Sequence, residues 1–410
     1  MDLRPDARLH RHQRQLPQLS HPALSRRAAL GGFASLAAGP ALAADPLRLP
    51  AVREIPLPDF PGAHAIWGAT GRDPAGGIWF GVSALDGGSA HLMRFDPISG
   101  TVTDRGDVLG QLPSRRPDET QIKIHSKILP MEDGRMWFTS TDEDGEVDDG
   151  SAPPRWGSHL WSLAPGETGW RHHLAIPEGL TCAAGGGRTV WALGLWGHVL
   201  YSVDIHTGAV ARREIGAPGG HMSRNILADV RGHAFVPRVQ VGADGVVRAE
   251  LLEFAPPMTL RGTTTLENYA PGMSPSAAHG IIGLATMADG SIVIATSAGF
   301  LHLIQPGEPA LVTPLGWFHP DGRSYASSLF AWDGNRIGGL AQAAPDVWDW
   351  VVRDLATGQS RARRIDLPLG RIQLIYGSDV RDNAGRVYIV WRHSTDRGKV
   401  PVLLQLDLPS

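Results

Sequence analysis

One pattern of apolar and polar positions repeats along most of the chain. Each copy has a first run of small residues or histidine, a glycine turn, an aromatic-rich second run, a third run ending near aspartate, and a turn into a polar fourth run. Short runs of β-branched and aromatic residues between such turns predict strands. Seven copies are recognisable, with their clearest parts at His64–Val82, Ile124–Ser140, Leu180–Leu193, His221–Arg238, His279–Thr296, Tyr325–Leu340 and Tyr376–Trp391.

The length of the repeat indicates the architecture. Repeats of about 40 to 60 residues with four strands each are typical of β-propeller blades. One such sheet cannot bury both of its faces alone, so neighbouring sheets must stack. The sequence therefore predicts an all-β fold, a seven-bladed β-propeller of four-stranded antiparallel blades.

The two ends of the repeat region should meet in one blade. The last copy runs out at Ser410 after three strands, whereas Val52-Arg53-Glu54-Ile55 resembles the fourth runs of other copies, such as Arg212-Arg213-Glu214-Ile215. We therefore expect residues 51–56 to be the fourth strand of the last blade. This pairing would remove an open sheet edge.

The first 43 residues do not follow the repeat. The pair Arg26-Arg27 follows four other arginines and precedes the apolar stretch Ala28–Leu42, and Ala41-Leu42-Ala43 fits a cleavage site. This order predicts a twin-arginine-type signal peptide. An apolar stretch of about 15 residues is shorter than the 20 or so that a membrane span needs. We expect residues 44–410 to form a single domain, periplasmic or secreted, with no membrane span.

Composition and charge agree with this interpretation. The 410 residues include 50 Gly, 32 Pro and 13 Trp, which suits short strands between tight turns. The formal net charge is −3, and because residues 1–43 hold six Arg against two Asp, the remainder carries about −7. An acidic domain argues against nucleic acid as a partner. The single cysteine, Cys182, cannot form an internal disulfide and should be buried, and we expect a monomer.

Candidate chemistry gathers where the first strands begin. In a propeller these starts converge on one mouth of the central channel. Alignment on the glycine turns places five residues at equivalent starts: His64, Lys123, His221, His279 and Arg323. Two positions further on, on the same strand face, lie His125, Ser223, Tyr325 and Tyr376.

These side chains predict a cationic, proton-transferring surface that would bind an anionic ligand. Arg238 and Arg392 end second strands near the same mouth and could bind a carboxylate or sulfate in a bidentate way. Arg224 should point between blades. A long acidic insertion, Thr141–Trp156, could hold Ca²⁺, but its spacing does not match the calcium loop and favours a solvated hairpin.

The reaction classes with recognisable motifs find no support. There is no Gly-x-Ser-x-Gly elbow, no His-Glu-x-x-His pair, no phosphate loop and no paired inner-strand carboxylates. Histidine or tyrosine beside cations instead suits β-elimination from a uronic acid. A cation neutralises the carboxylate, a base removes the C5 proton, and a phenol protonates the leaving oxygen.

The repeated Gly-x-Trp-Phe strands and Ser/Thr-Gly turns resemble the propellers of the virginiamycin B lyase and gluconolactonase group. Lys123-Ile124-His125-Ser126-Lys127, followed by Asp133-Gly134-Arg135-Met136-Trp137-Phe138, is similar to the propeller polysaccharide lyases such as ulvan lyases. That resemblance implies a carbon–oxygen lyase acting on a polysaccharide. By position, it implies a base among His125, His221 and His279, an acid at Tyr325 or Tyr376, and a neutralising cation at Lys123 or Arg323.

Two alternatives remain open from the sequence. The propeller could be a non-catalytic scaffold that binds a ligand or a protein at its mouth, because the fold does not determine function. It could also bind a metal, since imidazoles from different blades, at His64, His221 and His279, can converge on Zn or Cu. No cofactor is required by the sequence, and a divalent metal (Zn or Ca) is a possibility.

Overall fold

The computed structural model describes residues 48–85, 88–145, 152–194, 198–216, 223–241, 244, 247–269, 279–367, 372–375, 379–396 and 398–408. Contacts divide the chain into residues 1–46 and 47–410, and all described residues belong to the second unit. The expected export signal therefore lies outside the described residues and stays a prediction. His221 and Tyr376 also lie outside them.

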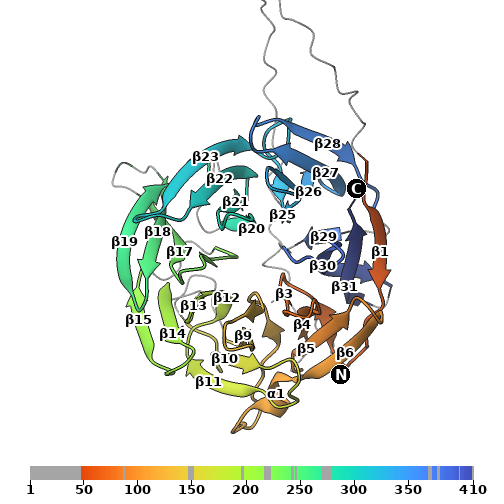
Figure 1. Ribbon diagram of the computed structural model, residues 1–410. Coiled ribbons are helices and arrows are strands. Elements are labelled where there is room, and N and C mark those ends of the chain that lie inside the picture. The colour runs from red at the N-terminus through yellow and green to blue at the C-terminus, as the bar shows by residue number, and fades with distance from the viewer. Residues whose placement is uncertain are drawn as a thin grey trace, which may run out of the picture. The chain divides into compact units, whose positions relative to one another are not determined.

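The second unit is built of seven antiparallel sheets, which lie around a common centre (Figure 1). Blade 1 has β2 (Ala63–Ala65), β4 (Ile78–Ala84), β5 (His91–Asp96) and β6 (Thr101–Asp107). Blade 2 has β7 (Lys123–Ile124), β9 (Met136–Thr141), β10 (Ser158–Leu163) and β11 (Arg171–Ile176). Blade 3 has β12 (Leu180–Gly186), β13 (Thr189–Gly194), β14 (Val199–Asp204) and β15 (Val210–Glu214).

The other four blades follow the same order from the centre outward. Blade 4 has β16 (Leu227–Ala228), β17 (Ala234–Val241), β18 (Val247–Ala255) and β19 (Thr259–Thr265); blade 5 has β20 (Ile281–Thr286), β21 (Ile292–Thr296), β22 (Phe300–Gln305) and β23 (Leu311–Trp317). Blade 6 has β24 (Tyr325–Ala326), β26 (Arg336–Ala344), β27 (Val347–Asp354) and β28 (Ser360–Arg364); blade 7 has β29 (Ile372–Ile375), β30 (Val387–Thr395), β31 (Gly398–Asp407) and β1 (Ala51–Ile55). The predicted seven-bladed propeller is confirmed.

The second strands show why adjacent blades must pack. On β4, Trp79 packs with Phe138 of blade 2, whereas Phe80, one position on, packs with Tyr388 of blade 7. Successive side chains of a strand point to opposite faces, and here both faces meet another sheet. All of Ile78–Ala84 is therefore buried, while the outermost strand β6 is largely exposed. This difference explains the apolar second runs and polar fourth runs of the sequence repeat.

The ring closes through β1, as the sequence predicted. Strand β1 pairs antiparallel with β31, from Ala51 opposite Asp407 to Ile55 opposite Leu403. Ile55 is buried and packs in the cluster that joins blades 7 and 1. The first described strand therefore supplies the fourth strand of blade 7.

Within the described ranges, the innermost strand is broken in three blades. In blades 1, 2 and 6 a second short piece, β3 (Thr70–Arg72), β8 (Leu129–Pro130) or β25 (Phe330–Ala331), pairs with the same neighbour. Trp67 and His125 lie in two of these breaks. Beyond the breaks, the backbones of blades 1 and 2 approach each other closely. A Cβ atom added to Gly71 would lie only 1.8 Å from the carbonyl oxygen of Ile128. Only glycine fits there without moving backbone.

A short helix, α1 (Val108–Gln111), was not predicted. It follows β6 and is capped by Asp107, whose side chain accepts a hydrogen bond from the backbone N–H of Gly110 at 2.9 Å. Within the described part of the chain, no helix has the length and hydropathy needed to cross a membrane.

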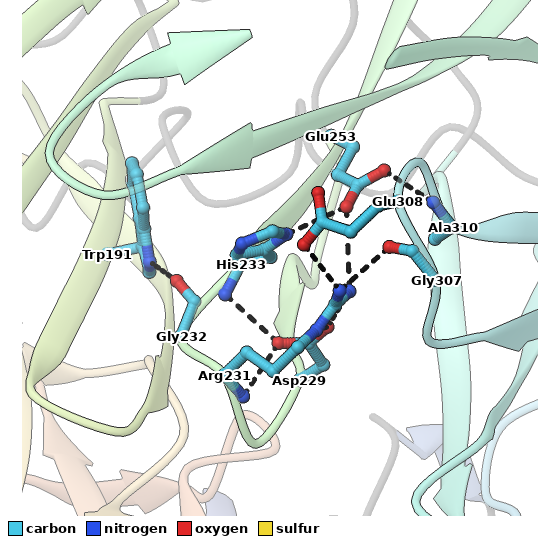
Figure 2. Close-up of polar contacts among 9 residues, drawn as sticks. All are labelled: Trp191, Asp229, Arg231, Gly232, His233, Glu253, Gly307, Glu308 and Ala310. Carbon is cyan, nitrogen blue, oxygen red and sulfur yellow. Dashed lines mark hydrogen bonds and ion pairs between the residues drawn. The ribbon is translucent and has the colours of Figure 1, made fainter. Parts of the chain in front are cut away.

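Polar side chains also join blades, as Figure 2 shows for blades 4 and 5. Arg231 reaches from the first turn of blade 4 to the carbonyl oxygen of Gly307 (2.7 Å) and to the Glu308 carboxylate (3.0 Å) in blade 5. Glu253 accepts one hydrogen bond from the backbone N–H of Ala310 and is paired with His233, each at 2.8 Å. The buried charges of this network are thus paired, which fits a structural role.

His302 on β22 is a buried residue whose ring nitrogens lack hydrogen bonds within the described part of the chain. Its side chain is 1% exposed, and neither ring nitrogen has a hydrogen-bond partner among the described residues. Burial lowers the pKa of His302 from 6.5 to about 4, so the ring is neutral at pH 7. An unpaired buried polar group costs about 1–3 kcal/mol.

We expect His302→Leu to stabilise the protein. At pH 7 the gain should be about 1–3 kcal/mol, because leucine leaves no polar atom unpaired. The unfolded histidine takes up a proton as the pH falls below 6.5, whereas the folded one resists until about 4, so the wild-type protein loses stability across this window. The difference in unfolding free energy between the leucine variant and the wild type should therefore grow by about 3 kcal/mol once the pH is below that window. Urea unfolding at pH 7 and pH 5 measures both effects, and equal or lower stability of the variant at both pH values would contradict them.

Candidate functional site

Residues at the inner ends of the blades form a series of contacts around the centre of the ring. The contacts run between blades 7 and 1, 1 and 2, 2 and 3, 4 and 5, and 5 and 6. The pairs are Arg392–His64, Trp67–Lys123, His125–Thr181, Arg224–His279 and His279–Tyr325. Residues far apart in the sequence thus make contact where neighbouring blades meet around the centre of the ring.

The larger group surrounds Trp67, and we call His64, Trp67, Lys123, His125 and Arg392 the Trp67 cluster. Arg392 Nη1 lies 2.8 Å from His64 Nε2, and its guanidinium carbon lies 4.6 Å from the centre of the Trp67 ring. Lys123 Nζ lies 5.1 Å from the same ring. Trp67 therefore makes cation–π contacts with two cations from blades 2 and 7.

The His64 ring is held neutral in this cluster. Its side chain is buried, and burial lowers its pKa from 6.5 to about 3, with further lowering by the charges of Arg392, Lys399 and Lys123. Because Arg392 can only donate, His64 Nε2 accepts its hydrogen bond. His64 thus orients the guanidinium.

His125 is also buried and neutral. Its Nδ1 lies 2.9 Å from the carbonyl oxygen of Thr181, which can only accept, so Nδ1 carries the hydrogen and Nε2 is the basic nitrogen. Burial, and then the charges of Arg224 and Lys123, lower the pKa of His125 well below 6.5. The charges of cations from blades 4 and 2 thus add to burial in keeping His125 neutral.

A histidine–tyrosine pair joins blades 5 and 6. The backbone N–H of Arg224 donates to the carbonyl oxygen of His279 at 2.8 Å, and His279 Nδ1 lies 3.0 Å from the Tyr325 hydroxyl. The two rings meet edge to face with their centres 5.7 Å apart. This pair can move a proton between its two groups.

The remaining candidates have different surroundings. Arg238 forms a 2.7 Å ion pair with Glu250, the residue opposite it on β18. Arg323 is exposed and lies two residues before Tyr325. Ser223 donates to the carbonyl oxygen of Asn225 at 2.6 Å and accepts from the N–H of Ile281 at 3.1 Å, which ties blade 4 to blade 5.

Two contributors escaped the sequence analysis. Trp67 lies in a strand break, outside the aligned positions, and no periodic signal marks it. Arg224 was expected to point between blades, and its charge lowers the pKa of His125. Glu143, in the acidic insertion, forms an ion pair with Lys123. Among the described residues, no group of three or more His, Cys, Asp or Glu side chains is arranged to hold a metal ion.

No protein-family model matches the chain, and no curated protein matches its sequence. Many solved structures are similar, and two of them illustrate the likeness. One, titled as the structure of U3-55K, is 11% identical over 87% of this chain and 98% of its own, with a TM-score of 0.49. The other, titled as a novel fungal alcohol oxidase of the AA5 family in complex with copper, is 12% identical over 88% of this chain and 77% of its own, with a TM-score of 0.52. At this identity, the second likeness supports the propeller fold and nothing finer.

Proposed function

We propose that this propeller is an exported lyase that cleaves an anionic, uronate-containing saccharide by β-elimination at the mouth formed by its inner strands. The observation that carries the proposal is the His279–Tyr325 pair, in which His279 Nδ1 lies 3.0 Å from the Tyr325 hydroxyl. A hydrogen-bonded base and acid are two of the groups that this elimination requires, and the third is a cation.

The substrate's carboxylate binds at Lys123, which also contacts the Trp67 ring. Neutralising the carboxylate makes the C5 proton more acidic. His64 and His125 stay neutral, so they add no charge that would compete for the substrate. Trp67 and His64 keep Lys123 and Arg392 in place around the bound saccharide.

Proton transfer then follows a closed cycle. Nε2 of His279 takes the C5 proton, the electron pair forms the C4–C5 double bond, and the C4–O4 bond breaks. The Tyr325 hydroxyl gives its proton to O4. The proton on His279 Nδ1 passes to the Tyr325 oxygen, which leaves a neutral imidazole protonated at Nε2. Exchange with solvent, in which Nε2 gives up one proton and Nδ1 takes up one, then returns the pair to its first state. No oxidant or metal takes part.

The test is a panel of polyuronates offered to the purified residues 44–410. The unsaturated uronate product absorbs in the ultraviolet, so turnover appears as a rise in absorbance that metal chelators leave unchanged. A flat trace on every substrate would remove the lyase proposal. If the same substrates nevertheless bind, the non-catalytic anion-binding propeller becomes the better account.

A further inference from the structure

Lys123, the cation proposed to bind the substrate's carboxylate, is already paired with a carboxylate of the same chain. Glu143 Oε1 forms an ion pair with Lys123 Nζ, and both side chains are mostly shielded, with 27% and 15% of their surfaces exposed. Lys123 also contacts Trp67, and its charge lowers the pKa of both His64 and His125. Glu143 is therefore joined to the Trp67 cluster through its ion pair with Lys123.

The backbone on either side of Glu143 is held in place. The neighbouring Asp142 is buried and accepts three hydrogen bonds, from the Thr120 hydroxyl at 2.6 Å and from the backbone N–H groups of Asp144 and Trp156 at 3.0 Å each. Arg155 adds a backbone hydrogen bond to Asp144 at 2.7 Å. A carboxylate on an anchored turn loses less conformational freedom on pairing than one on a free loop.

Glu143 and a uronate present the same chemical group. Both offer a carboxylate to an ammonium in a partly desolvated place, and two carboxylates competing for one ammonium repel each other. A ligand can use Lys123 fully only when Glu143 has moved aside. Uncharged saccharides have no group with which to displace it.

We propose that Glu143 is a built-in competitor that occupies the carboxylate position at Lys123, so that only an anionic saccharide can open the site. This inference rests on the proposed function, because it assigns Lys123 to the substrate's carboxylate. It makes Glu143 a determinant of specificity, because it occupies the one cation that the substrate's carboxylate is proposed to use.

The test compares Glu143→Gln with the wild-type protein in calorimetric binding of an oligogalacturonate and of its uncharged methyl ester. Glutamine keeps the size and removes the charge, so the oligogalacturonate should bind about five- to tenfold more tightly. Asp144→Asn, one residue along the same turn, is the matched control and should bind like the wild type. In a Lys123→Met background, Glu143→Gln should bring no gain.

Each result decides the matter. Unchanged or weaker binding by Glu143→Gln overturns the proposal, and so does the absence of binding in every variant. If Glu143→Gln binds more tightly but no polyuronate is turned over, the role of Glu143 as a competitor is supported and the lyase activity is rejected. If a polyuronate is turned over but Glu143→Gln binds no more tightly, the lyase activity is supported and the competitor role is rejected.

Discussion

Replacing Tyr325 by phenylalanine is expected to lower the turnover number on the best polyuronate by about 10²–10⁴-fold, the range for losing a positioned proton donor. Phenylalanine keeps the buried ring in β24 but removes the hydroxyl that lies 3.0 Å from His279 Nδ1. The leaving oxygen would then depart without a proton. The affinity for the substrate should change little, because the proposed mechanism assigns the substrate's carboxylate to Lys123 and not to Tyr325.

Steady-state kinetics separate this chemical role from a structural one. A loss in kcat with little change in KM supports the proton donor, whereas a similar kcat would contradict it. Tyr201→Phe is the matched control, since the Tyr201 hydroxyl also makes a short hydrogen bond, at 2.7 Å to Glu178, but belongs to a third strand in blade 3. That variant should keep its activity.

The fold could be predicted because its signals are local. Each blade repeats the same turn glycines and the same apolar second strand, and these depend on backbone conformation and on burial of both sheet faces. The closure by β1 was also predictable, because its largely exposed, charge-bearing sequence matches other outermost strands such as β15.

The site could be predicted only in part, because its contacts are long-range. His64 and Arg392 are 328 residues apart and meet because blades 7 and 1 are neighbours in the ring. The blade alignment identified five candidates that contact residues of neighbouring blades: His64, Lys123, His125, His279 and Tyr325. It could not find Trp67, whose position follows from a break in the inner strand, nor show that Arg238 is opposite Glu250.

Ring closure itself predicts the second large effect. Strand β1 covers the edge of β31 with five paired residues, buries Ile55, and packs Val52 against the cluster between blades 6 and 7. Starting the chain at Leu57 instead of Ala44 should remove roughly 5 kcal/mol of hydrophobic burial and hydrogen bonding. This is a large share of the 5–15 kcal/mol that typically stabilises a domain.

The shortened protein should melt about 10 °C lower than the protein starting at Ala44, as measured by circular dichroism. It should also associate as its concentration rises, because the bare edge of β31 offers unpaired N–H and C=O groups to a second chain. Adding a peptide with the sequence of residues 48–57 should restore the melting temperature, since the peptide can occupy the same edge. A shortened protein that stays monomeric and melts at the original temperature would mean that six complete blades hold the ring closed without β1.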